Sequence, residues 1–525
     1  HRDLHRLIRR QRQMCIRDRR YLGYPHPDQL PLTKLYRGHP YTNVTVFQIL
    51  YKVFPAPLVP DDATRYFPAG DVGLRHQAPY PCCVLDPRFV VSMLSHFVRE
   101  PANWSPLHNY RYWARFAVRH ETAMRELDRR SKNAADLSAL WDVIETAQRW
   151  NRELLGIHRW SLMAADLLVP LLSKLIALWV SKEQQAELSA RLLSGLPNKS
   201  LELDQALRRL AGETGPGEAD LQDFLAEHGH RSFSLDIYHP TFADDPEQVL
   251  GLVEMAGREP DPATRVAERE SVEREIKAAL IARPLGWLKL LIFERVLTLA
   301  QRYVILREEQ RFAWQLTLAL MRRTFLCIGE RLATRGVLDR ADDVFFATCD
   351  EIEALAWDSS PDVSSDAPST RPLRQTAAAR RTTFDRLQRE FELAPHLTYP
   401  PFLRGNRPLE DTPQDQEKTG RWRGVPVSPG LVRGPVRVAF TPERLDRVAP
   451  GDILVTHSTD PGWTPLFGRL GGLIMERGGQ LSHGSVVARE YGLPAVVGIP
   501  HITAHLRDGD VVLLDGLTGT VTLCQ

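Results

Sequence analysis

Apolar residues recur at three- and four-residue spacing through most of the middle of the chain, which is the spacing of one face of an α-helix. The pattern begins near Trp104 and continues to about Leu355. It predicts a mostly helical region, with regular stretches at Ala134–Leu155, Leu167–Ser194 and Leu201–Ala211.

The most apolar window, Leu162–Val180, is interrupted by Asp166, Pro170 and Lys174. Because charged side chains are costly in the core of a bilayer, we interpret this window as a buried helix pair and not as a membrane span.

The longest helical pattern runs from about Pro284, a residue favoured at helix starts, to Gly336, a residue favoured just past helix ends. It is compatible with one helix or with two helices joined near Arg302–Arg311.

The period changes in the last part of the chain. Short β-rich runs bounded by Gly and Pro replace the helical pattern, at Gly434–Phe440, Asp452–Thr456, Gly472–Met475, Ala495–Gly498 and Val511–Leu514. One helix is predicted among them, from Ser482 to about Tyr491, with Gly492 as its C-terminal stop. This pattern predicts a compact α/β domain.

These changes divide the chain into four parts, and the fold class is multidomain, with a mostly α-helical middle domain followed by a C-terminal α/β domain. Residues 21–356 form the helical part, with an irregular stretch and a few short helices up to about Pro101. Residues 357–423 hold a polar low-complexity insert, a short helix near Thr382–Leu393 and a linker. Residues 424–525 form the α/β domain. Residues 1–20, with eight arginines and no clean apolar period, are interpreted as an artefactual or disordered segment that resembles translated sequencing adapter.

Composition narrows the functional classes. A hydrophobic content of 43% and a charged content of 25% are typical of globular proteins. A net charge of +2 gives no bulk attraction to nucleic acid or to an anionic membrane. Six cysteines without paired spacing fit a reducing cytoplasm and predict neither a disulfide framework nor a metal site.

The candidate chemistry lies at the start of the predicted C-terminal helix. Gly478 and Gly479 would let the backbone approach an anion, and Gly484 follows the histidine. Ser482 is a natural N-cap, which places His483 in the first turn, where free N–H groups and the helix dipole favour a phosphoryl group. Neutral imidazole is a nucleophile near pH 7. A helix-capping histidine without chemistry is the simpler alternative.

A resemblance favours the chemical interpretation. The run Gly478-Gly-Gln-Leu-Ser-His-Gly-Ser-Val-Val-Ala-Arg489 and the segments Gly424–Gly430, Gly451–Val455, Asp460–Leu466 and Asp515–Val521 resemble, in order, the swivelling phosphohistidine domain of phosphoenolpyruvate-utilising enzymes. The resemblance implies that His483 carries the phosphoryl group and that Ser482 and Arg489 assist it. Arg489 lies six residues after His483, which does not place it on the same helix face.

A second candidate lies within the longest helical pattern, where Arg307-Glu-Glu-Gln-Arg311 places five polar residues in a row. Because five consecutive positions cover every face of a helix, at least one must point at the core or a cleft. Arg307 and Arg311 share a face suited to anions, and Glu308 could act as a general base on an acceptor hydroxyl. A solvated helix face is the alternative. The family resemblance implies an acceptor site at this position.

A third candidate, Gly229-His-Arg-Ser-Phe-Ser-Leu-Asp-Ile237, resembles an acceptor-side segment of the same family, with serines where the family has glycine and glutamate. It would place His230, Arg231 and Asp236 at the acceptor, or it is a structural loop.

Domain order resembles that of rifampicin phosphotransferase and related phosphoenolpyruvate-synthase-like proteins. The resemblance implies a dikinase-type reaction in which an ATP-grasp domain, upstream in the same frame or on a separate chain, binds ATP and Mg²⁺ and phosphorylates the histidine. The histidine then delivers the phosphoryl group to a small-molecule acceptor. We expect this chain to be the acceptor and carrier part of such an enzyme, without its ATP-grasp domain. A non-catalytic regulatory module that retains the phosphohistidine domain is the alternative.

Overall fold

The computed structural model describes residues 33–36, 39–42, 109–197, 199–211, 217–255, 262–357, 371–393, 403–404, 407–408, 420–440 and 448–524. The predictions for residues 1–20, for the polar insert, and for most of the stretches 21–108 and 394–419 fall outside these residues. Within the first stretch, β1 (Thr33–Tyr36) pairs antiparallel with β2 (His39–Thr42), two strands that the apolar pattern did not predict. A two-residue strand pair, β3 (Leu403–Arg404) and β4 (Arg407–Pro408), follows later.

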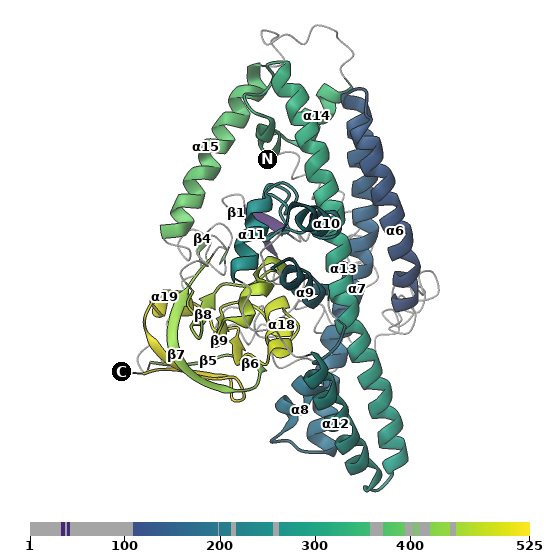
Figure 1. Ribbon diagram of the computed structural model, residues 1–525, viewed down its shortest axis with the longest axis vertical. Coiled ribbons are helices and arrows are strands. Elements are labelled where there is room, and N and C mark those ends of the chain that lie inside the picture. The colour runs from purple at the N-terminus through teal and green to yellow at the C-terminus, as the bar shows by residue number, and fades with distance from the viewer. Residues whose placement is uncertain are drawn as a thin grey trace. The chain divides into compact units, whose positions relative to one another are not determined.

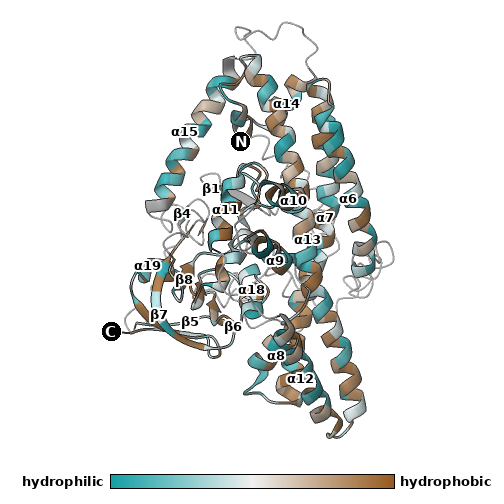
Figure 2. Ribbon diagram, viewed as in Figure 1, coloured by the Kyte–Doolittle hydropathy of each residue, from teal (hydrophilic) through white to brown (hydrophobic). Residues whose placement is uncertain are grey.

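The chain forms two compact units, and three long helices contribute to both: α6 (Asn109–Lys132), α7 (Leu137–Trp179) and α13 (Gly286–Thr334). The first unit takes the described residues within 1–108, 114–153 and 317–412, including β1, β2, η4 (Ala341–Phe346), α14 (Cys349–Ala356) and α15 (Arg371–Leu393). Polar side chains tie its helices together: Arg323 pairs with Asp128 at 2.6 Å. Figure 2 shows that α6 is hydrophilic over much of its length, so only a narrow apolar stripe is left for packing.

The second unit combines residues 109–113, 154–316 and 413–525. Its shorter helices are α8 (Gln185–Leu192), α9 (Lys199–Ala211), α10 (Glu218–His228), α11 (Pro246–Met255) and α12 (Pro262–Ile281). Helices α9, α10 and α11 share one apolar core that includes Leu207, Phe224 and Phe242.

One predicted helix break, and a second that the sequence left open, are absent. The Leu162–Val180 window does not form a helix pair, because α7 continues through Pro170. The polar run of α13 does not interrupt that helix either, since Arg, Glu and Gln are all strong helix formers. By length and composition alone, α7 could cross a membrane, but a single such helix is weak evidence, because core helices of soluble proteins meet the same criterion.

The C-terminal part of the second unit is built on an eight-stranded mixed sheet, drawn in green to yellow in Figure 1. The strand order is β5-β12-β11-β7-β8-β9-β10-β6, and neighbours from β7 to β10 are parallel. The strands are β5 (Arg421–Arg423), β6 (Val425–Ser428), β7 (Leu431–Val438), β8 (Ile453–Thr456), β9 (Gly472–Met475), β10 (Ala495–Val497), β11 (Val511–Asp515) and β12 (Thr520–Leu523).

Strands β8, β9 and β10 are buried along their whole length, because apolar side chains pack on both faces. One layer of the core holds Trp463, Phe467 and Val487, and the other holds Ile453, Ile474 and Val496. The predicted fold class, a helical region followed by a C-terminal α/β domain, is confirmed. Strands β5, β6 and β12 were not predicted, since they are short and carry few apolar residues.

The helix that follows β9, α18 (His483–Tyr491), has Ser482 at its N-cap and Gly492 at its C-cap, as the sequence predicts. Gly492 adopts the left-handed conformation, with φ of 61°, and the side chain of Arg265 packs directly over it. Glycine accepts this φ without the penalty that a Cβ atom brings.

We expect Gly492→Ala to lower the free energy of unfolding by about 1–2 kcal/mol, because an L-residue pays the left-handed penalty and Arg265 must move. The control is Gly156→Ala in α7, where an added methyl group meets nothing within 4 Å and should stabilise the helix by about 0.5–1 kcal/mol. Urea unfolding followed by circular dichroism measures both. Equal effects of the two substitutions would contradict the role of Gly492.

Candidate active site

His483 is the first residue of α18 and is 2% exposed. The loop between β9 and α18 turns at Gly478, whose φ of 127° is a conformation that other residues rarely adopt. Gly484 packs against Thr459 and Met475 so closely that a side chain at this position would collide with both. The two glycines therefore shape the turn that presents the histidine, and the carbonyl of Gly479 accepts a hydrogen bond from Ser485.

Ser482 occupies the predicted N-cap position, but its hydroxyl does not cap the helix. It shares a 2.7 Å hydrogen bond with the hydroxyl of Ser485 instead. This side chain therefore leaves the backbone N–H groups at the start of α18 available to donate to an anion.

Each ring nitrogen of His483 has one polar neighbour. Nδ1 lies 3.4 Å from Oε2 of Glu308, and Nε2 lies 3.3 Å from Oγ1 of Thr464 in η6 (Pro461–Gly468). A carboxylate only accepts hydrogen bonds, so the tautomer that satisfies both contacts has its proton on Nδ1 and accepts from Thr464 at Nε2. This leaves Nε2 as the nitrogen with a lone pair.

Burial lowers the pKa of His483, and the contact with Glu308 offsets only part of this effect. Burial alone would raise the pKa of Glu308, but the hydrogen bond and charge of His483, together with Arg311 and Arg307, hold it near 2. We describe the pair as a neutral imidazole beside an ionised carboxylate, because the pKa of His483 and the pKa of Glu308 both lie below their ordinary values. A neutral imidazole is the nucleophilic form.

The polar run of α13 divides between two sides of the helix. Glu309 accepts a 2.9 Å hydrogen bond from Trp113, while Gln310 accepts from Nδ1 of His158 and donates to the hydroxyl of Ser161, both in α7. On the other side, Glu308 meets His483. These contacts hold α13 in one rotation about its axis.

Arg311 lies on the same side as Glu308 and forms an ion pair with Asp460, the residue that precedes η6. Ser200, at the start of α9, lies 3.4 Å from Oε2 of Glu308. Arg307 influences the pKa values of Glu308 and His158. The second candidate motif and the histidine motif are thus brought together, as a helix face buried against the C-terminal domain and not as a solvated face.

The third candidate segment contributes two of its three predicted residues. Arg231 is 2% exposed, and its charge interacts with Glu308 and Arg311. The ring of His230 packs edge-on against Phe312, with centroids 4.6 Å apart. Asp236 is exposed and accepts a 3.0 Å hydrogen bond from the backbone of Tyr238, so it closes a turn away from this cluster.

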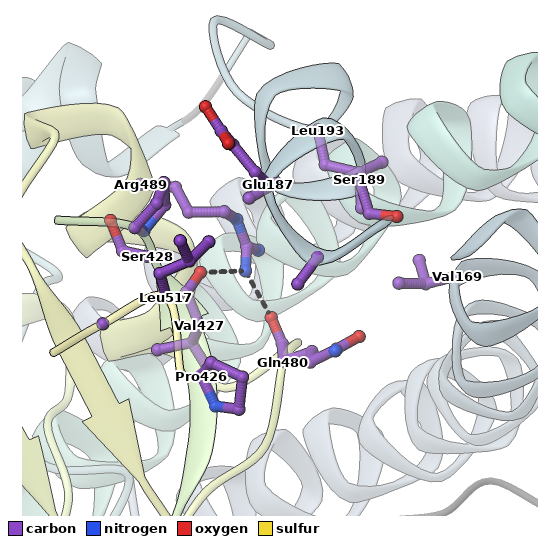
Figure 3. A pocket seen from close by; sticks show the side chains of 14 residues that line it. Val169, Glu187, Ser189, Leu193, Pro426, Val427, Ser428, Gln480, Arg489 and Leu517 are labelled. Carbon is purple, nitrogen blue, oxygen red and sulfur yellow. Dashed lines mark hydrogen bonds between the residues drawn. The ribbon is translucent and has the colours of Figure 1, made fainter. Parts of the chain in front are cut away.

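Arg489 is buried on a different side of α18. Its Nη1 donates to the carbonyl oxygens of Gln480 at 2.7 Å and Val427 at 3.3 Å (Figure 3). It borders a small, partly open pocket between the C-terminal domain and α7 and α8, with Glu187 and Ser189 on the helical side. This geometry favours a role for Arg489 in holding the Gly478–Ser482 turn, and contact with a phosphoryl group stays a prediction.

Sequence reasoning missed Asp460 and Thr464 as site residues, although both lie in a segment that carried the resemblance. Ser200 had no recognisable pattern. Among the residues that the structure describes, no group of three His, Cys, Asp or Glu side chains is arranged to hold a metal ion.

Comparison with known proteins bears on both motifs. Residues 448–519 match the mobile domain of PEP-utilising enzymes, and residues 212–308 match the fourth domain of rifampicin phosphotransferase. Residues 448–519 are thus similar to the mobile domain of the phosphoenolpyruvate-utilising enzymes. The predicted resemblance is therefore confirmed.

Individual relatives agree. The chain is 31% identical over 339 residues to a rifampicin phosphotransferase of Streptomyces sviceus, covering 62% of this chain and 36% of that protein. It is 27% identical over 313 residues to a rifampicin phosphotransferase of Bacillus subtilis, covering 58% and 34%. It is 30% identical over 316 residues to a prodigiosin-synthesising transferase of Serratia marcescens, covering 58% and 33%. The chain spans about a third of the length of these relatives.

A further contact joins the C-terminal domain to the helices. Oε2 of Glu490, near the end of α18, accepts a 2.9 Å hydrogen bond from the backbone N–H of Gly195, in the connection between α8 and α9. Arg269 of α12 holds the same connection by donating to the carbonyls of Ser194 and Gly195. Burial raises the pKa of Glu490 to about 7, and the N–H groups of Gly195 and Leu196 with Arg489 and Arg265 offset only part of that rise.

We expect Glu490 to make stability depend on pH. Its folded pKa of about 7 lies above the ordinary 4.5, so its contribution is full below pH 4.5 and is lost as the pH rises through 7. The loss is of the order of 3 kcal/mol, from about 1.4 kcal/mol per pKa unit. The measurement is the free energy of unfolding from pH 4.5 to 8.5 for the wild type and Glu490→Gln.

The pH slope should be flatter in Glu490→Gln and unchanged in Glu218→Gln, a substitution at an exposed position of α10. If Glu490→Gln keeps the wild-type slope, the carboxyl group is ionised throughout and the expectation is wrong.

Proposed function

We propose that this chain is the acceptor-binding and phosphohistidine-carrier portion of an ATP-dependent, dikinase-type phosphotransferase. The overall reaction converts ATP, an acceptor and water into AMP, phosphate and a phosphorylated acceptor. The observation that carries the proposal is the buried contact of a neutral His483 with Glu308, among Arg231, Arg307 and Arg311. A structural histidine has no need of such an arrangement, since burying charged groups is costly unless a partner compensates them.

The proposed chemistry at this site is a single displacement. The P–N bond to Nε2 of His483 breaks and its electron pair returns to the ring, while the acceptor oxygen forms the new P–O bond. The acceptor proton passes to Glu308, whose Oε1 is buried and has no hydrogen-bond partner among the described residues. Because Nδ1 faces Glu308 in the unphosphorylated ring, this proton transfer requires the loaded ring to turn so that Nε2 and its phosphoryl group face the carboxylate. The added negative charge then raises the pKa of Glu308, which makes the carboxylate a better base when the carrier is loaded.

ATP and Mg²⁺ belong to the step that loads the histidine. We assign that step to an ATP-grasp domain, in the same frame or on a separate chain. The loading step requires His483 to leave the position beside Glu308, because the ring is enclosed there. The proposal therefore includes movement of the C-terminal domain between the ATP-grasp domain and the position beside Glu308. We also propose a cytoplasmic location, where ATP is available.

The acceptor is a small molecule with a hydroxyl group. The relatives are named for rifampicin phosphorylation and for prodigiosin synthesis, so the family does not fix one acceptor. Neither nucleic acid nor a membrane is proposed as a partner. The alternative, a regulatory module without catalysis, predicts that His483 is never phosphorylated or that its phosphoryl group moves to no acceptor.

We expect the protein in its full natural reading frame, incubated with ATP labelled at the β-phosphoryl group, to acquire label that is acid-labile and base-stable. His483→Ala should remove it. For the chain described above, phosphoramidate replaces ATP as a chemical phosphoryl donor, and mass spectrometry locates the modification. Label that persists in His483→Ala, or that never forms from either donor, would overturn the carrier assignment.

We expect Glu308→Gln to keep the labelling of His483 but to slow transfer to an acceptor by about 10²–10⁴-fold, the usual contribution of a general base. The matched control is Glu309→Gln, since a glutamine can still accept the hydrogen bond of Trp113. Loss of label from phosphorylated protein is followed with rifampicin first and then with a low-molecular-weight metabolite extract. Equal transfer rates in the two variants would show that Glu308 is not the base.

A further inference from the structure

The guanidinium group of Arg231 is enclosed, and no carboxylate of the described residues is recorded in hydrogen-bonding contact with it. Its Nε and Nη2 atoms are buried and have no hydrogen-bond partner among the described residues. Burial lowers its pKa to about 10, so the group is charged at neutral pH. Buried charges in proteins are normally paired, because an unpaired one costs several kcal/mol. Such a group indicates a binding site for an anionic ligand.

The loop that carries Arg231 is fixed by its own hydrogen bonds. The N–H of Arg231 donates to His228, and its carbonyl accepts from Phe242 at 2.8 Å. Ser232 donates to the carbonyl of Pro240, and Gln315 of α13 donates to the carbonyl of Ser232 at 3.1 Å. The serine in place of the family's glycine therefore has a structural use. These bonds hold Arg231 inward, against α13, whether or not an anion is bound.

Neighbouring groups add to the same positive region. The centre of the guanidinium group lies 5.4 Å from the ring centroid of Phe312, and Nζ of Lys199 lies 5.5 Å from the same centroid. Nε of Arg311 is also buried and without a hydrogen-bond partner among the described residues, although its Nη2 pairs with Asp460. With Lys199 and its partner Glu202 included, four cations (Arg231, Arg307, Arg311 and Lys199) face three carboxylates (Glu308, Asp460 and Glu202), so the cluster keeps an excess of one positive charge.

We propose that Arg231, with Nε of Arg311, forms the binding site for the phosphoryl group as it passes from His483 to the acceptor. The inference rests on the proposed function for the identity of the anion as a transferring phosphoryl group. In the displacement described above, charge spreads over the three outer phosphoryl oxygens, and fixed N–H donors stabilise it without reorganisation. Arg231 is then a catalytic residue that contacts the reacting phosphoryl group, and not a residue that shapes the acceptor pocket.

An empty anion site can be tested with inorganic phosphate, independently of ATP or an acceptor. At constant ionic strength, replacing chloride by phosphate should raise the Tm of the wild-type chain, because a ligand of the folded state stabilises it. In Arg231→Met the phosphate-dependent rise should disappear, with at least about a tenfold loss of phosphate affinity, since a charge-assisted donor pair contributes more than 1.4 kcal/mol. Its Tm in chloride should be unchanged or higher, because a buried unpaired charge is gone.

Two further variants keep the test decisive. Arg209→Met, at an exposed position of α9, should retain the full phosphate effect. If Arg231→Met does not fold, Arg231→Lys replaces it: the charge stays but the planar fork is lost, and phosphate affinity should fall at least about threefold. A phosphate effect that survives in the Arg231 variants, or a fall of Tm in chloride with no change in phosphate dependence, overturns the assignment.

The same variants separate this inference from the proposed function. If His483 takes up label but phosphate affinity does not depend on Arg231, the carrier assignment stands and the anion site is wrong. If phosphate binds through Arg231 but His483 is never labelled, the anion site stands and the phosphotransfer proposal fails.

Discussion

The enclosed contact between His483 and Glu308 is the constraint on which the rest of the second unit depends. A carboxylate cannot remain ionised in an apolar surrounding unless cations or donors face it. Helix α13 meets that requirement with its own arginines, and the mobile domain adds the imidazole. Neither motif is complete alone: the helix face has an uncovered charge without the histidine, and the histidine has no orienting acceptor without the helix.

Under the proposed function His483 must also leave this position, and its contacts are suited to that. The two ring contacts of His483 are long for hydrogen bonds, at 3.3 and 3.4 Å, so the ring is oriented without being held tightly. The stronger polar contacts lie further out, at Arg311 with Asp460 and at Glu490 with Gly195. Placing the binding contacts away from the reacting nitrogen lets docking strength change without altering the nucleophile.

The sequence predicted local features of this site well, because they depend on neighbouring residues. The helix from His483, its stop at Gly492 and the β-rich runs around it follow from periodicity and from the special backbone freedom of glycine. The sequence could not predict which side of helix α13 faces His483. The run Arg307–Arg311 covers all faces of a helix, and only the packing of Trp113, His158 and Ser161 on one side decides that Glu308 faces the other. Asp236 shows the converse, since a match to a motif did not place its side chain at the cluster.

Gly462 lies at the start of η6 directly against the ring of Phe233, so closely that a methyl group there would overlap the ring. Gly462 thus makes room for Phe233 of the segment Gly229–Ile237, and not for a side chain of the C-terminal domain. The two positions form a steric lock whose halves are encoded more than two hundred residues apart. A chimera that exchanges the C-terminal domain with that of a related enzyme must therefore keep a glycine at position 462 wherever Phe233 is kept. Otherwise both parts fold, but the new side chain collides with Phe233 and prevents their packing.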